Sequence, residues 1–398
     1  MTHLRSILTL AVLAAVLPSP ARALPSWARR YNMNCSGCHS PTVPRLNATG
    51  IAFKWAGYRM PGDIGTAVQV SKIENYVAAR IEMAYDYVTR KNGDRETDGF
   101  SVPSASLFAA GPIGKHFGAY LELDREPEAT VDVVGSMTGV WGNEKRFAGV
   151  RVGQGHMLMA SGGVAGFDRS TGISMPLAYD ESITSSVPLR LGGDQAGAEA
   201  FVVLGGRNRT AVQLLNGVVV GAGEGGSAVS RRDVALTNQT MWDDEGSGFG
   251  VAAYLGSALG LVPNEPTLSR RFYRLSATAS KIVRRVEVMG GYVYGKDVDV
   301  PSGDERPDVV SSPAGTSHWL QGQYTAKTQP LTLFGRYERL NPDQSTVDAS
   351  RRRFLVGAIL PISMPEYFRW SVELFRDTYQ SASTPQRSGL ATRLQVAF

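Results

Sequence analysis

The chain has 398 residues, of which 43% are hydrophobic and 19% charged, and it contains 44 glycines but only two cysteines. At about 150 residues per domain this length could hold two or three domains, and two cysteines exclude a small scaffold held by several disulfides. The 41 basic and 36 acidic residues are too evenly balanced for a nucleic-acid-binding protein, which carries a clustered basic face. Beyond the N-terminus no apolar run reaches the roughly 18–20 residues of a membrane-spanning helix, which excludes a helical membrane protein.

Residues 1–23 have the pattern of a signal peptide. Arg5 supplies positive charge, the stretch from Ile7 to Leu17 is apolar, and Ala21-Arg22-Ala23 matches a small-x-small cleavage site. The apolar stretch is too short to span a bilayer, and a retained membrane anchor is the alternative. We expect the chain to be exported and cleaved after Ala23.

Both cysteines lie in Cys35-Ser36-Gly37-Cys38-His39, which is the C-x-x-C-H pattern of c-type haem attachment. Two thiols at this spacing add to the vinyl groups of one porphyrin edge, and the adjacent histidine becomes the proximal iron ligand. A zinc site would need a second pair of ligands, a thioredoxin-like redox pair would lie in an alternating strand–helix pattern, and a plain disulfide would not need the histidine. We predict one covalently bound haem c held by Cys35, Cys38 and His39.

The predicted haem segment spans residues 24–68 and contains one short helix. Asn47 is a good N-cap, and Ile51, Trp55 and Tyr58 follow at helical spacing on one face. Met60 is the local candidate for the distal iron ligand because it follows this helix.

Other residues could complete or surround the haem. His116, His156 and His318 are the next candidates for the distal ligand, and an open sixth position is the remaining alternative. Arg45, Lys54 and Arg59 are interpreted as solvated surface charges, with neutralisation of the haem propionates as the alternative.

From residue 69 to 398 the sequence alternates with a period of two. Ile73, Val77, Ile81 and Tyr85 share one parity, whereas charged residues occupy the other. A soluble β-sandwich also alternates, but its strands average about five or six residues, and many segments here are twice as long. Alternation over such lengths favours a transmembrane antiparallel β-barrel of about 16 strands, with fourteen or eighteen as alternatives.

The predicted strands are 71–88, 101–110, 116–125, 130–140, 146–156, 196–205, 209–220, 232–242, 248–259, 271–281, 285–296, 317–326, 331–340, 352–360, 367–379 and 388–398. Short links alternate with longer polar ones, as expected for short periplasmic turns and longer outer loops. The predicted short links are 111–115, 206–208, 282–284, 328–330 and 361–365. The last strand ends at Phe398, which resembles the assembly signal of bacterial outer-membrane barrels; an edge strand of a soluble protein is the alternative. An even number of strands returns the C-terminus to the periplasmic side, where the haem segment begins.

The stretch from Met157 to Gln195 has no convincing alternation and is rich in glycine and serine. We predict that it folds inward and narrows the lumen; an ordinary outer loop is the alternative. Charged residues on the predicted inward parity are normal for a porin lumen and do not by themselves mark a substrate site. These inward residues are Glu122, Asp124, Glu199, Arg336, Glu338, Arg369 and Glu373.

The combination resembles the monohaem cytochrome–porin fusions of the outer-membrane iron-oxidase family. The resemblance rests on the haem motif, on Leu24-Pro25-Ser26-Trp27-Ala28-Arg29 before it, and on Pro44-Arg45-Leu46-Asn47 and Phe53-Lys54-Trp55-Ala56-Gly57-Tyr58 after it. The barrel resembles the family only by architecture and length. The resemblance implies oxidation of extracellular Fe(II), with electrons passed through the haem to a periplasmic c-type cytochrome or another electron carrier.

These observations lead to three hypotheses about function. The first is an electron-transfer protein of the bacterial outer membrane, with its haem on the periplasmic side or inside the barrel as a plug. Outer-loop acids would offer oxygen ligands to an approaching cation, namely Asp94, Glu96, Asp98, Asp304, Glu305 and Asp308. The second is a diffusion porin for small solutes with a structural or sensory haem plug. The third is a periplasmic cytochrome with a soluble β-domain.

Overall fold

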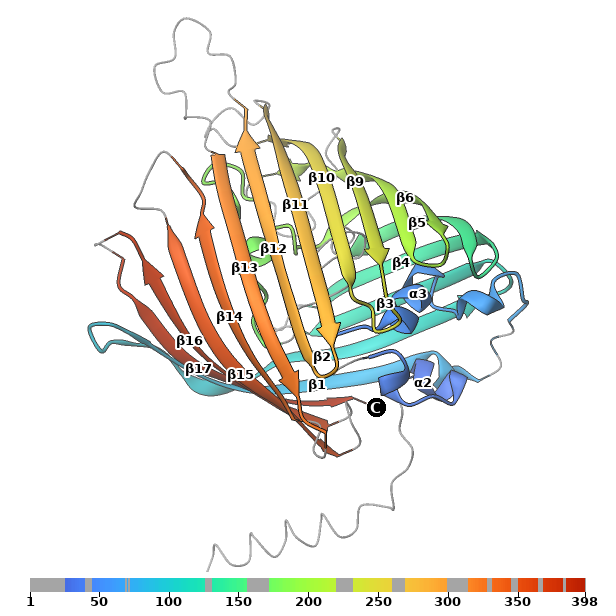
Figure 1. Cartoon of the computed structure of the whole chain (residues 1–398), viewed down its shortest axis with the longest axis horizontal. Coiled ribbons are helices and arrows are strands. Elements are labelled where there is room, and N and C mark those ends of the chain that lie inside the picture. Colours follow the sequence, from blue (N-terminus) through green and yellow to red (C-terminus); the bar gives the residue numbers. More distant parts are fainter. Residues whose placement is uncertain are drawn as a thin grey trace, which may run out of the picture.

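The computed structural model of the chain describes residues 26–39, 45–68, 70, 72–125, 131–155, 172–219, 232–259, 269–298, 314–327, 331–344, 350–363, 368–381 and 384–397. The predicted signal peptide, the candidate ligand His156 and the terminal Phe398 lie outside these residues. Most described residues form one antiparallel sheet, which closes on itself as a barrel (Figure 1).

Sixteen long strands build the described part of the barrel, together with the two-residue strand β8 (Val218–Val219). Their bounds are β1 Val77–Arg90, β2 Arg95–Ile113, β3 Phe117–Arg125, β4 Val131–Gly142, β5 Arg146–Gly155, β6 Gln195–Leu204, β7 Asn208–Asn216, β9 Arg232–Met241, β10 Gly248–Leu259, β11 Ser269–Val283, β12 Val286–Asp297, β13 Ala314–Thr325, β14 Thr332–Asn341, β15 Arg351–Ser363, β16 Phe368–Tyr379 and β17 Arg387–Ala397. The strands β1 and β17 pair in antiparallel register, with Arg80 opposite Ala397, and this pairing closes the sheet. The prediction of an all-β antiparallel barrel is confirmed.

Helices are short and lie inside or beside the barrel. They are α2 (Ser26–Tyr31), η1 (Cys35–Gly37), α3 (Ala48–Trp55), η2 (Pro61–Asp63), η3 (Ile73–Asn75) and α5 (Leu177–Asp180). In the ranges that the structure describes, no helix has the length and apolar character needed to cross a membrane.

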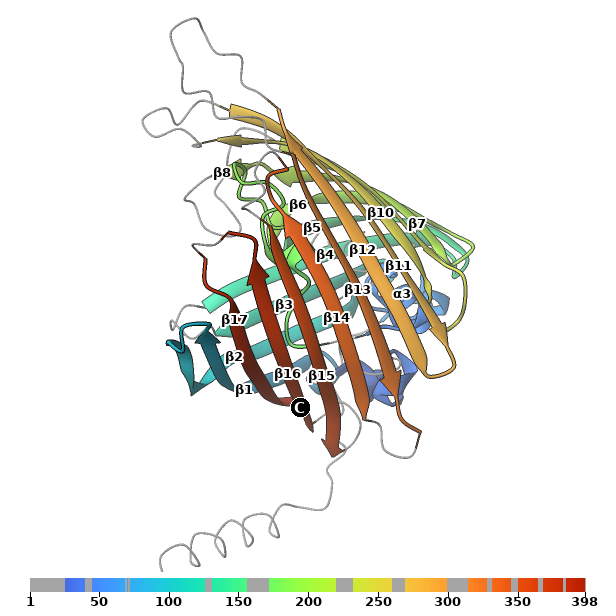
Figure 2. The ribbon, with the colours of Figure 1, turned by 60° about the vertical axis from the view of Figure 1, so that its left-hand side comes forward.

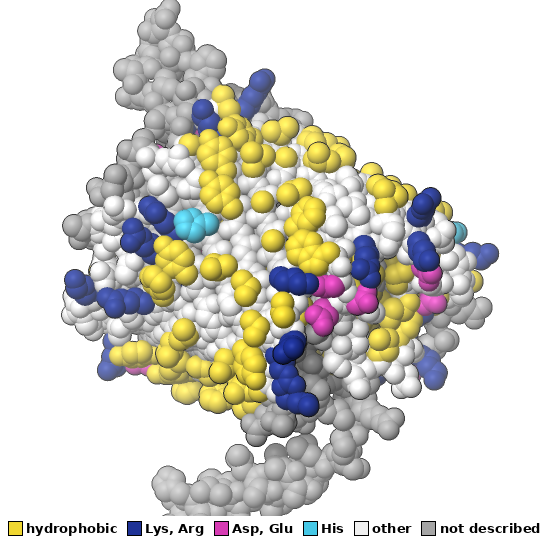
Figure 3. All heavy atoms as spheres, viewed as in Figure 1, with side chains coloured by type: hydrophobic (Ala, Val, Ile, Leu, Met, Phe, Trp, Pro, Cys, Tyr) yellow, Lys and Arg dark blue, Asp and Glu magenta, His cyan; other side chains and the backbone are white. Residues whose placement is uncertain are grey.

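The outer wall of the barrel is apolar. Along each strand, exposed hydrophobic side chains alternate with residues that point into the barrel, as in β14, where Leu333 is exposed and Phe334 is buried. Exposed leucines and valines recur on most strands, and hydrophobic side chains cover much of the visible wall in Figure 3. This pattern is typical of a barrel whose outer surface contacts lipid.

The connections divide the barrel into two ends. Short turns, at 114–116, 143–145, 205–207, 242–247 and 284–285, gather at one end, which we call the short-turn end. The strand ends that the longer connections join lie at the opposite end, which we call the long-loop end. The C-terminus and the N-terminal segment 26–68 both lie at the short-turn end, as Figures 1 and 2 show. The predicted alternation of connections and the predicted return of the C-terminus are confirmed.

The predicted strand over 71–88 is wrong at its start. β1 begins at Val77, and Ile73 is an exposed residue of η3 rather than part of an apolar strand face. The cause is tertiary: the Arg29 guanidinium donates to the backbone carbonyls of Glu74 (2.7 Å) and Val77 (2.7 Å), which holds this segment beside α2.

Other boundaries also differ from the prediction by a few residues, and three of them are instructive. β2 begins at Arg95 rather than at 101, because it stays paired with β1 up to Thr89 opposite Arg95. Ile282 and Val283 belong to β11 and not to a turn, which consists of 284–285 alone. β15 likewise continues through Pro361 to Ser363.

Two large clusters of apolar side chains lie inside the barrel. One lies at the short-turn end, where Leu46, Ile51 and Trp55 of the N-terminal segment pack against residues such as Phe147 and Phe201 of the wall. The other lies deeper and is built around residues 177–191 of the inward segment. Both clusters place apolar side chains where a water-filled porin lumen would be polar.

Candidate functional site

The Cys35–His39 loop is a tight turn. The amides of Cys38 and His39 both donate to the Cys35 carbonyl oxygen, at 3.0 and 2.9 Å. Both cysteines are thiols, Cys35 is 9% exposed, and burial raises the pKa of the Cys38 thiol above its ordinary value. The loop therefore presents two thiols and one imidazole from a single turn of chain.

Asn47 fastens this loop to α3. Its side-chain oxygen accepts a hydrogen bond from the Gly50 amide (3.0 Å), which confirms the predicted N-cap. Its side-chain NH₂ donates to the carbonyls of Ser36 (3.3 Å) and Gly37 (3.2 Å), and its backbone amide donates to Cys38 (2.9 Å). One side chain thus caps the helix and holds the loop.

Glycine allows the helix to approach the loop closely. A Cβ atom at Gly50 would overlap the Cys38 carbonyl oxygen, so only glycine lets α3 pack here. On the other side the Met33 methyl carbon lies 2.6 Å from where a Gly37 Cβ would be. The sequence analysis missed Met33, whose contact depends on how α2 folds back over the loop.

The candidate distal ligands fall in different places. Met60 lies after α3, where its backbone amide donates a hydrogen bond to the hydroxyl oxygen of Tyr31 (3.3 Å), a residue that precedes the cysteine loop in sequence. His116 stacks with Trp141 (5.9 Å between ring centroids), and this tryptophan lies on the outer wall. His318 follows the outward parity of β13, beside Tyr337. Both imidazoles therefore lie against aromatic rings of the wall, and their candidacy as distal ligands stays a prediction.

The interpretation of Arg45 and Arg59 as solvated surface charges is also wrong. Arg45 donates to the Glu287 carboxylate of β12 (2.8 Å) and to the Gly246 carbonyl (2.7 Å), and its side chain is 2% exposed. Arg59, fully buried, donates to the carbonyls of Lys115 and Phe117 at the start of β3. The two guanidinium groups anchor the N-terminal segment to opposite parts of the wall, whereas Lys54 is only half-buried.

Tyr58 departs from the predicted helix face. Ile51 and Trp55 share a buried face as predicted, but α3 ends at Trp55 and Tyr58 has a positive φ of 62°. Its ring lies between those of Trp27 and Tyr120. The Trp55 indole instead donates to Gln239 of β9 (3.1 Å).

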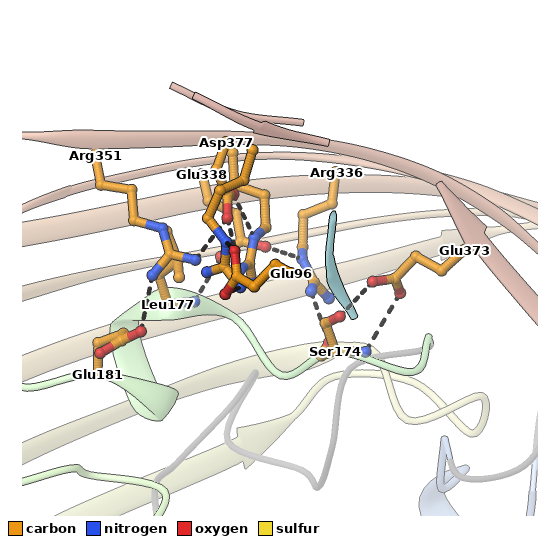
Figure 4. A network of polar contacts seen from close by, with 11 residues as sticks. Glu96, Ser174, Leu177, Glu181, Arg336, Glu338, Arg351, Glu373 and Asp377 are labelled. Carbon is orange, nitrogen blue, oxygen red and sulfur yellow. Dashed lines mark hydrogen bonds and ion pairs between the residues drawn. The ribbon is translucent and has the colours of Figure 1, made fainter. Parts of the chain in front are cut away.

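The described part of the 157–195 stretch, residues 172–194, folds into the barrel, as predicted. Its backbone is held by lumen carboxylates: Glu373 accepts from the amides of Ile173 (3.1 Å) and Ser174 (3.3 Å), and Glu338 accepts from the Leu177 amide. Figure 4 shows this network together with the Arg351–Glu181 ion pair (2.8 Å).

The inward segment also carries its own apolar core. Leu177, Tyr179 and Ile183 are almost fully buried against wall residues that include Phe272 and Trp319. Burial raises the pKa of Tyr179 to about 12, so this phenol stays neutral at ordinary pH. Hydrogen bonds and apolar packing together fix the segment against the wall from β7 to β16.

A more open strip of lumen wall lies on the opposite side, over β17, β1, β2 and β3. Arg80 pairs with Glu122 (3.3 Å) and Asp124 (3.5 Å), and Arg393 pairs with Asp86 (2.7 Å) and Glu82 (3.5 Å). These six side chains are 16–27% exposed, and four carboxylates face two guanidinium groups. The strip is therefore hydrated and carries an excess of negative charge.

The other predicted inward charges are confirmed. Glu199, Arg336, Glu338 and Glu373 are buried inside the barrel, and Arg369 lies on the same inward parity. Inside, Glu199 pairs with Arg151 (3.2 Å) and with Arg209.

Three of the predicted outer-loop acids lie at the β1–β2 hairpin. Glu96 and Asp98 lie in β2 and pair with Arg387 (2.6 Å) and Arg95 (3.1 Å), while Asp94 lies in the turn after β1. Asp304, Glu305 and Asp308 lie outside the described residues. Across the described ranges no group of three or more histidine, cysteine or acidic residues could hold a metal ion.

Solved structures with this architecture are porins. The chain is similar to the anion-selective porin from Comamonas acidovorans, with a TM-score of 0.59 and 13% identity over 81% of this chain and 98% of that one. It is also similar to the outer membrane channel DcaP of Acinetobacter baumannii, with a TM-score of 0.52, 11% identity and coverage of 80% and 96%. For OmpF of Salmonella typhi the TM-score is 0.53, with 10% identity and coverage of 80% and 97%. No protein-family profile and no curated protein matches the sequence. At these identities the likeness concerns the fold alone: the chain has the closed antiparallel barrel of porins.

Proposed function

We propose that the chain is a c-type cytochrome of the bacterial outer membrane that takes electrons from an extracellular donor, Fe(II), and passes them to a periplasmic carrier. The observation that carries the proposal is the position of the Cys35–His39 loop, which lies at the short-turn end of a porin-type barrel. Short turns face the periplasm in such barrels. A redox group on this loop would therefore lie between the barrel interior and the periplasm.

The residues of the loop fit a covalently bound haem c. Cys35 and Cys38 are both thiols, which is the form that adds to the porphyrin vinyl groups, and His39 follows in the same turn as proximal ligand. Met60 stays the proposed distal ligand. Bound haem would supply a one-electron centre whose potential depends on its axial ligands and burial. The protein itself would hold this loop in place through Asn47, Arg45 and Arg59.

The open strip supports a route for a cationic donor. Glu82, Asp86, Glu122 and Asp124 outnumber Arg80 and Arg393 on this wall, so their combined field attracts cations. Because these carboxylates are paired with arginine, they would guide Fe(II) along the wall without binding it tightly.

Exposed basic side chains at the short-turn end support electron transfer to a periplasmic carrier. Lys115, Lys145, Arg284 and Lys327 are exposed on four different turns. Two of the three acids of the 242–247 turn are paired with basic neighbours, Asp243 with Lys281 (2.9 Å) and Asp244 with Arg207. Such a surface would attract a carrier with an acidic docking face, such as a periplasmic c-type cytochrome.

The test is reduction of the purified protein by Fe(II). The mature chain in detergent is mixed with excess Fe(II) at the working pH in a stopped-flow instrument, and the visible haem spectrum is followed. We expect prompt reduction, and loss of the peroxidase stain in the Cys35→Ala, Cys38→Ala double variant. A haem that stays oxidised would reject iron as the donor, and a full stain in the double variant would reject covalent attachment.

The porin-type fold favours a second candidate function, which is diffusion of small solutes with a structural or sensory haem plug. Conductance in planar bilayers distinguishes the two. A large, steady open pore combined with a redox-silent haem would support transport. The apolar clusters around residues 46–55 and 177–191 argue for a small conductance, because they fill space that a diffusion pore needs.

A further inference from the structure

Three aromatic rings form a continuous stack between the open strip of the lumen and the N-terminal segment. The ring centroids of Trp27 and Tyr58 are 5.3 Å apart with planes inclined by 18°. Those of Tyr58 and Tyr120 are 5.5 Å apart with planes inclined by 21°. The stack crosses from Trp27 of α2, through Tyr58 in the turn that follows α3, to Tyr120 on the inner face of β3.

The lumen end of the stack is polar and charged. The Tyr120 hydroxyl donates to the Glu122 carboxylate, which also pairs with Arg80 (3.3 Å). Arg80 in turn lies over the ring of Phe108 (5.2 Å), whose centroid is 6.4 Å from that of Tyr120. Tyr120 is therefore an aromatic residue with a proton acceptor in contact, on the strip where a cationic donor would pass.

The other end of the stack reaches the helices that hold the cysteine loop. Trp27 lies 5.5 Å from Phe53 of α3, and its indole donates to the Ala110 carbonyl (3.3 Å). Gly50, on the same helix, packs directly against the Cys38 carbonyl. The stack thus ends beside α3, the helix that contacts the cysteine loop.

The backbone adopts an unusual conformation where it places Tyr58 in the stack. Gly57 and Tyr58 are both left-handed, with φ of 72° and 62°, and a bulky residue rarely adopts this conformation. A Cβ atom at Gly118 would overlap the Gly57 carbonyl oxygen, so the approach of this turn to β3 also needs glycine. Strained placement of a non-glycine residue is common at functional sites.

We infer that Trp27, Tyr58 and Tyr120 form an electron relay from the open strip of the lumen to the haem held by Cys35 and Cys38. The inference rests on the proposed function. Delocalised ring orbitals in van der Waals contact couple more strongly than saturated side chains. Fe(II) would give up one electron and become Fe(III), and a haem held by Cys35, Cys38 and His39 would accept that electron. When Tyr120 gives up an electron, its phenolic proton moves to Glu122 and returns as the donor refills the ring.

The first test compares haem reduction by Fe(II) among full-length variants. Tyr58→Leu and Trp27→Leu remove a ring, and we expect each to slow reduction by at least an order of magnitude. Tyr58→Phe keeps the ring and should retain most of the wild-type rate, whereas Tyr120→Phe should be slow because it cannot release a proton. Phe147→Leu is the matched control, since Phe147 is buried beside the N-terminal segment but lies outside the stack.

The second test does not depend on haem. A ruthenium photo-oxidant is attached through Ser36→Cys to the full chain in which Cys35→Ser and Cys38→Ser remove the native thiols. After a laser flash we expect a tyrosyl radical signal by electron paramagnetic resonance, lost in Tyr120→Phe and strongly reduced in Tyr58→Leu. Equal radical yield in all of these variants would overturn the relay.

The outcomes separate the relay from the proposed function. If wild-type haem is not reduced by Fe(II), the proposed donor is wrong, and the flash experiment still decides the relay. If wild-type haem is reduced and the Leu variants match its rate with unchanged haem spectra, the relay is wrong and the function stands. If a Leu variant has an altered haem spectrum, the reduction rate of Tyr58→Phe and the radical yield of the flash experiment decide whether the relay exists.

Discussion

Arg45 and Glu287 are 242 residues apart in sequence, yet they form an ion pair of 2.8 Å whose side chains are 2% and 0% exposed. This pair joins the N-terminal segment to β12 of the barrel wall. Gln323 also donates to Glu287 (2.7 Å), so the carboxylate is held from two sides. The contact makes the N-terminal segment part of the barrel interior.

Replacing Arg45 alone should detach the N-terminal segment. Arg45→Met leaves the Glu287 carboxylate buried without its cation, which costs about 3–5 kcal/mol when one partner of a buried pair is removed. We expect faster proteolysis between residues 26 and 68 in detergent. The double variant Arg45→Met, Glu287→Leu should recover most of the resistance, because no uncompensated charge remains. Equal proteolysis of the single variant and the wild type would show that the pair does not hold the segment.

Asn47 has two roles that one substitution can separate. Asn47→Asp keeps an acceptor for the Gly50 amide but loses the NH₂ donors to Ser36 and Gly37. We expect Asn47→Asp to keep α3 and to lower the yield of covalent haem, measured by peroxidase stain per mole of protein. Asn47→Ala should lose the cap as well, at a cost of about 0.5–2 kcal/mol. Haem yields that do not differ between Asn47→Asp and wild type would contradict the role of the amide.

The 242–247 turn should loosen in acid. Burial by itself raises the pKa of the Asp243 carboxyl. Hydrogen bonds from Ser247 and from the Lys281 ammonium have the larger, opposite effect, so the pKa of Asp243 is below its ordinary value. A carboxyl whose pKa is lower in the folded than in the unfolded chain stabilises the fold at pH values above its unfolded-state pKa. This stabilisation is lost as the pH falls through the folded-state pKa. We expect amide hydrogen exchange at Ser247 to accelerate relative to other turns as the pH falls below about 4. In Asp243→Asn this extra acceleration should be absent, and its persistence would assign the effect to another group.

The inward segment should behave as a fixed plug. Tyr179→Ala removes a buried ring from the interior cluster, and large-to-small changes of this kind cost about 3–5 kcal/mol. We expect single-channel conductance to rise, and to rise further in Tyr179→Ala combined with Glu338→Gln, which weakens the contact to the Leu177 amide. Leu333→Ala, on the outer wall, is the control and should leave the conductance unchanged. A wild-type channel as open as the variants would contradict a fixed plug.

Much of the barrel could be predicted from sequence because its cause is local. A strand with one face toward lipid and one toward the interior must alternate, and the alternation of Leu333, Phe334 and their neighbours is visible in the sequence itself. Where a distant contact intervened, the prediction was wrong. The Arg29 guanidinium donates hydrogen bonds to the carbonyls of Glu74 and Val77. The sequence of residues 71–77 gives no sign of this contact, because the donor comes from α2.

The loop of Cys35, Cys38 and His39 is a local motif, and so is the cap at Asn47, because each depends on residues only a few positions apart. The sequence alone therefore determined that a C-x-x-C-H motif precedes a long antiparallel barrel. The tertiary structure decided what fills that barrel. It buries Arg45 and Arg59 as anchors of the N-terminal segment, and it packs residues 172–194 inside the wall. It also stacks Tyr58 between Trp27 and Tyr120. Period-two alternation tells which side chains face inward, but the partner of each inward side chain depends on strand register and closure, which only the folded chain fixes.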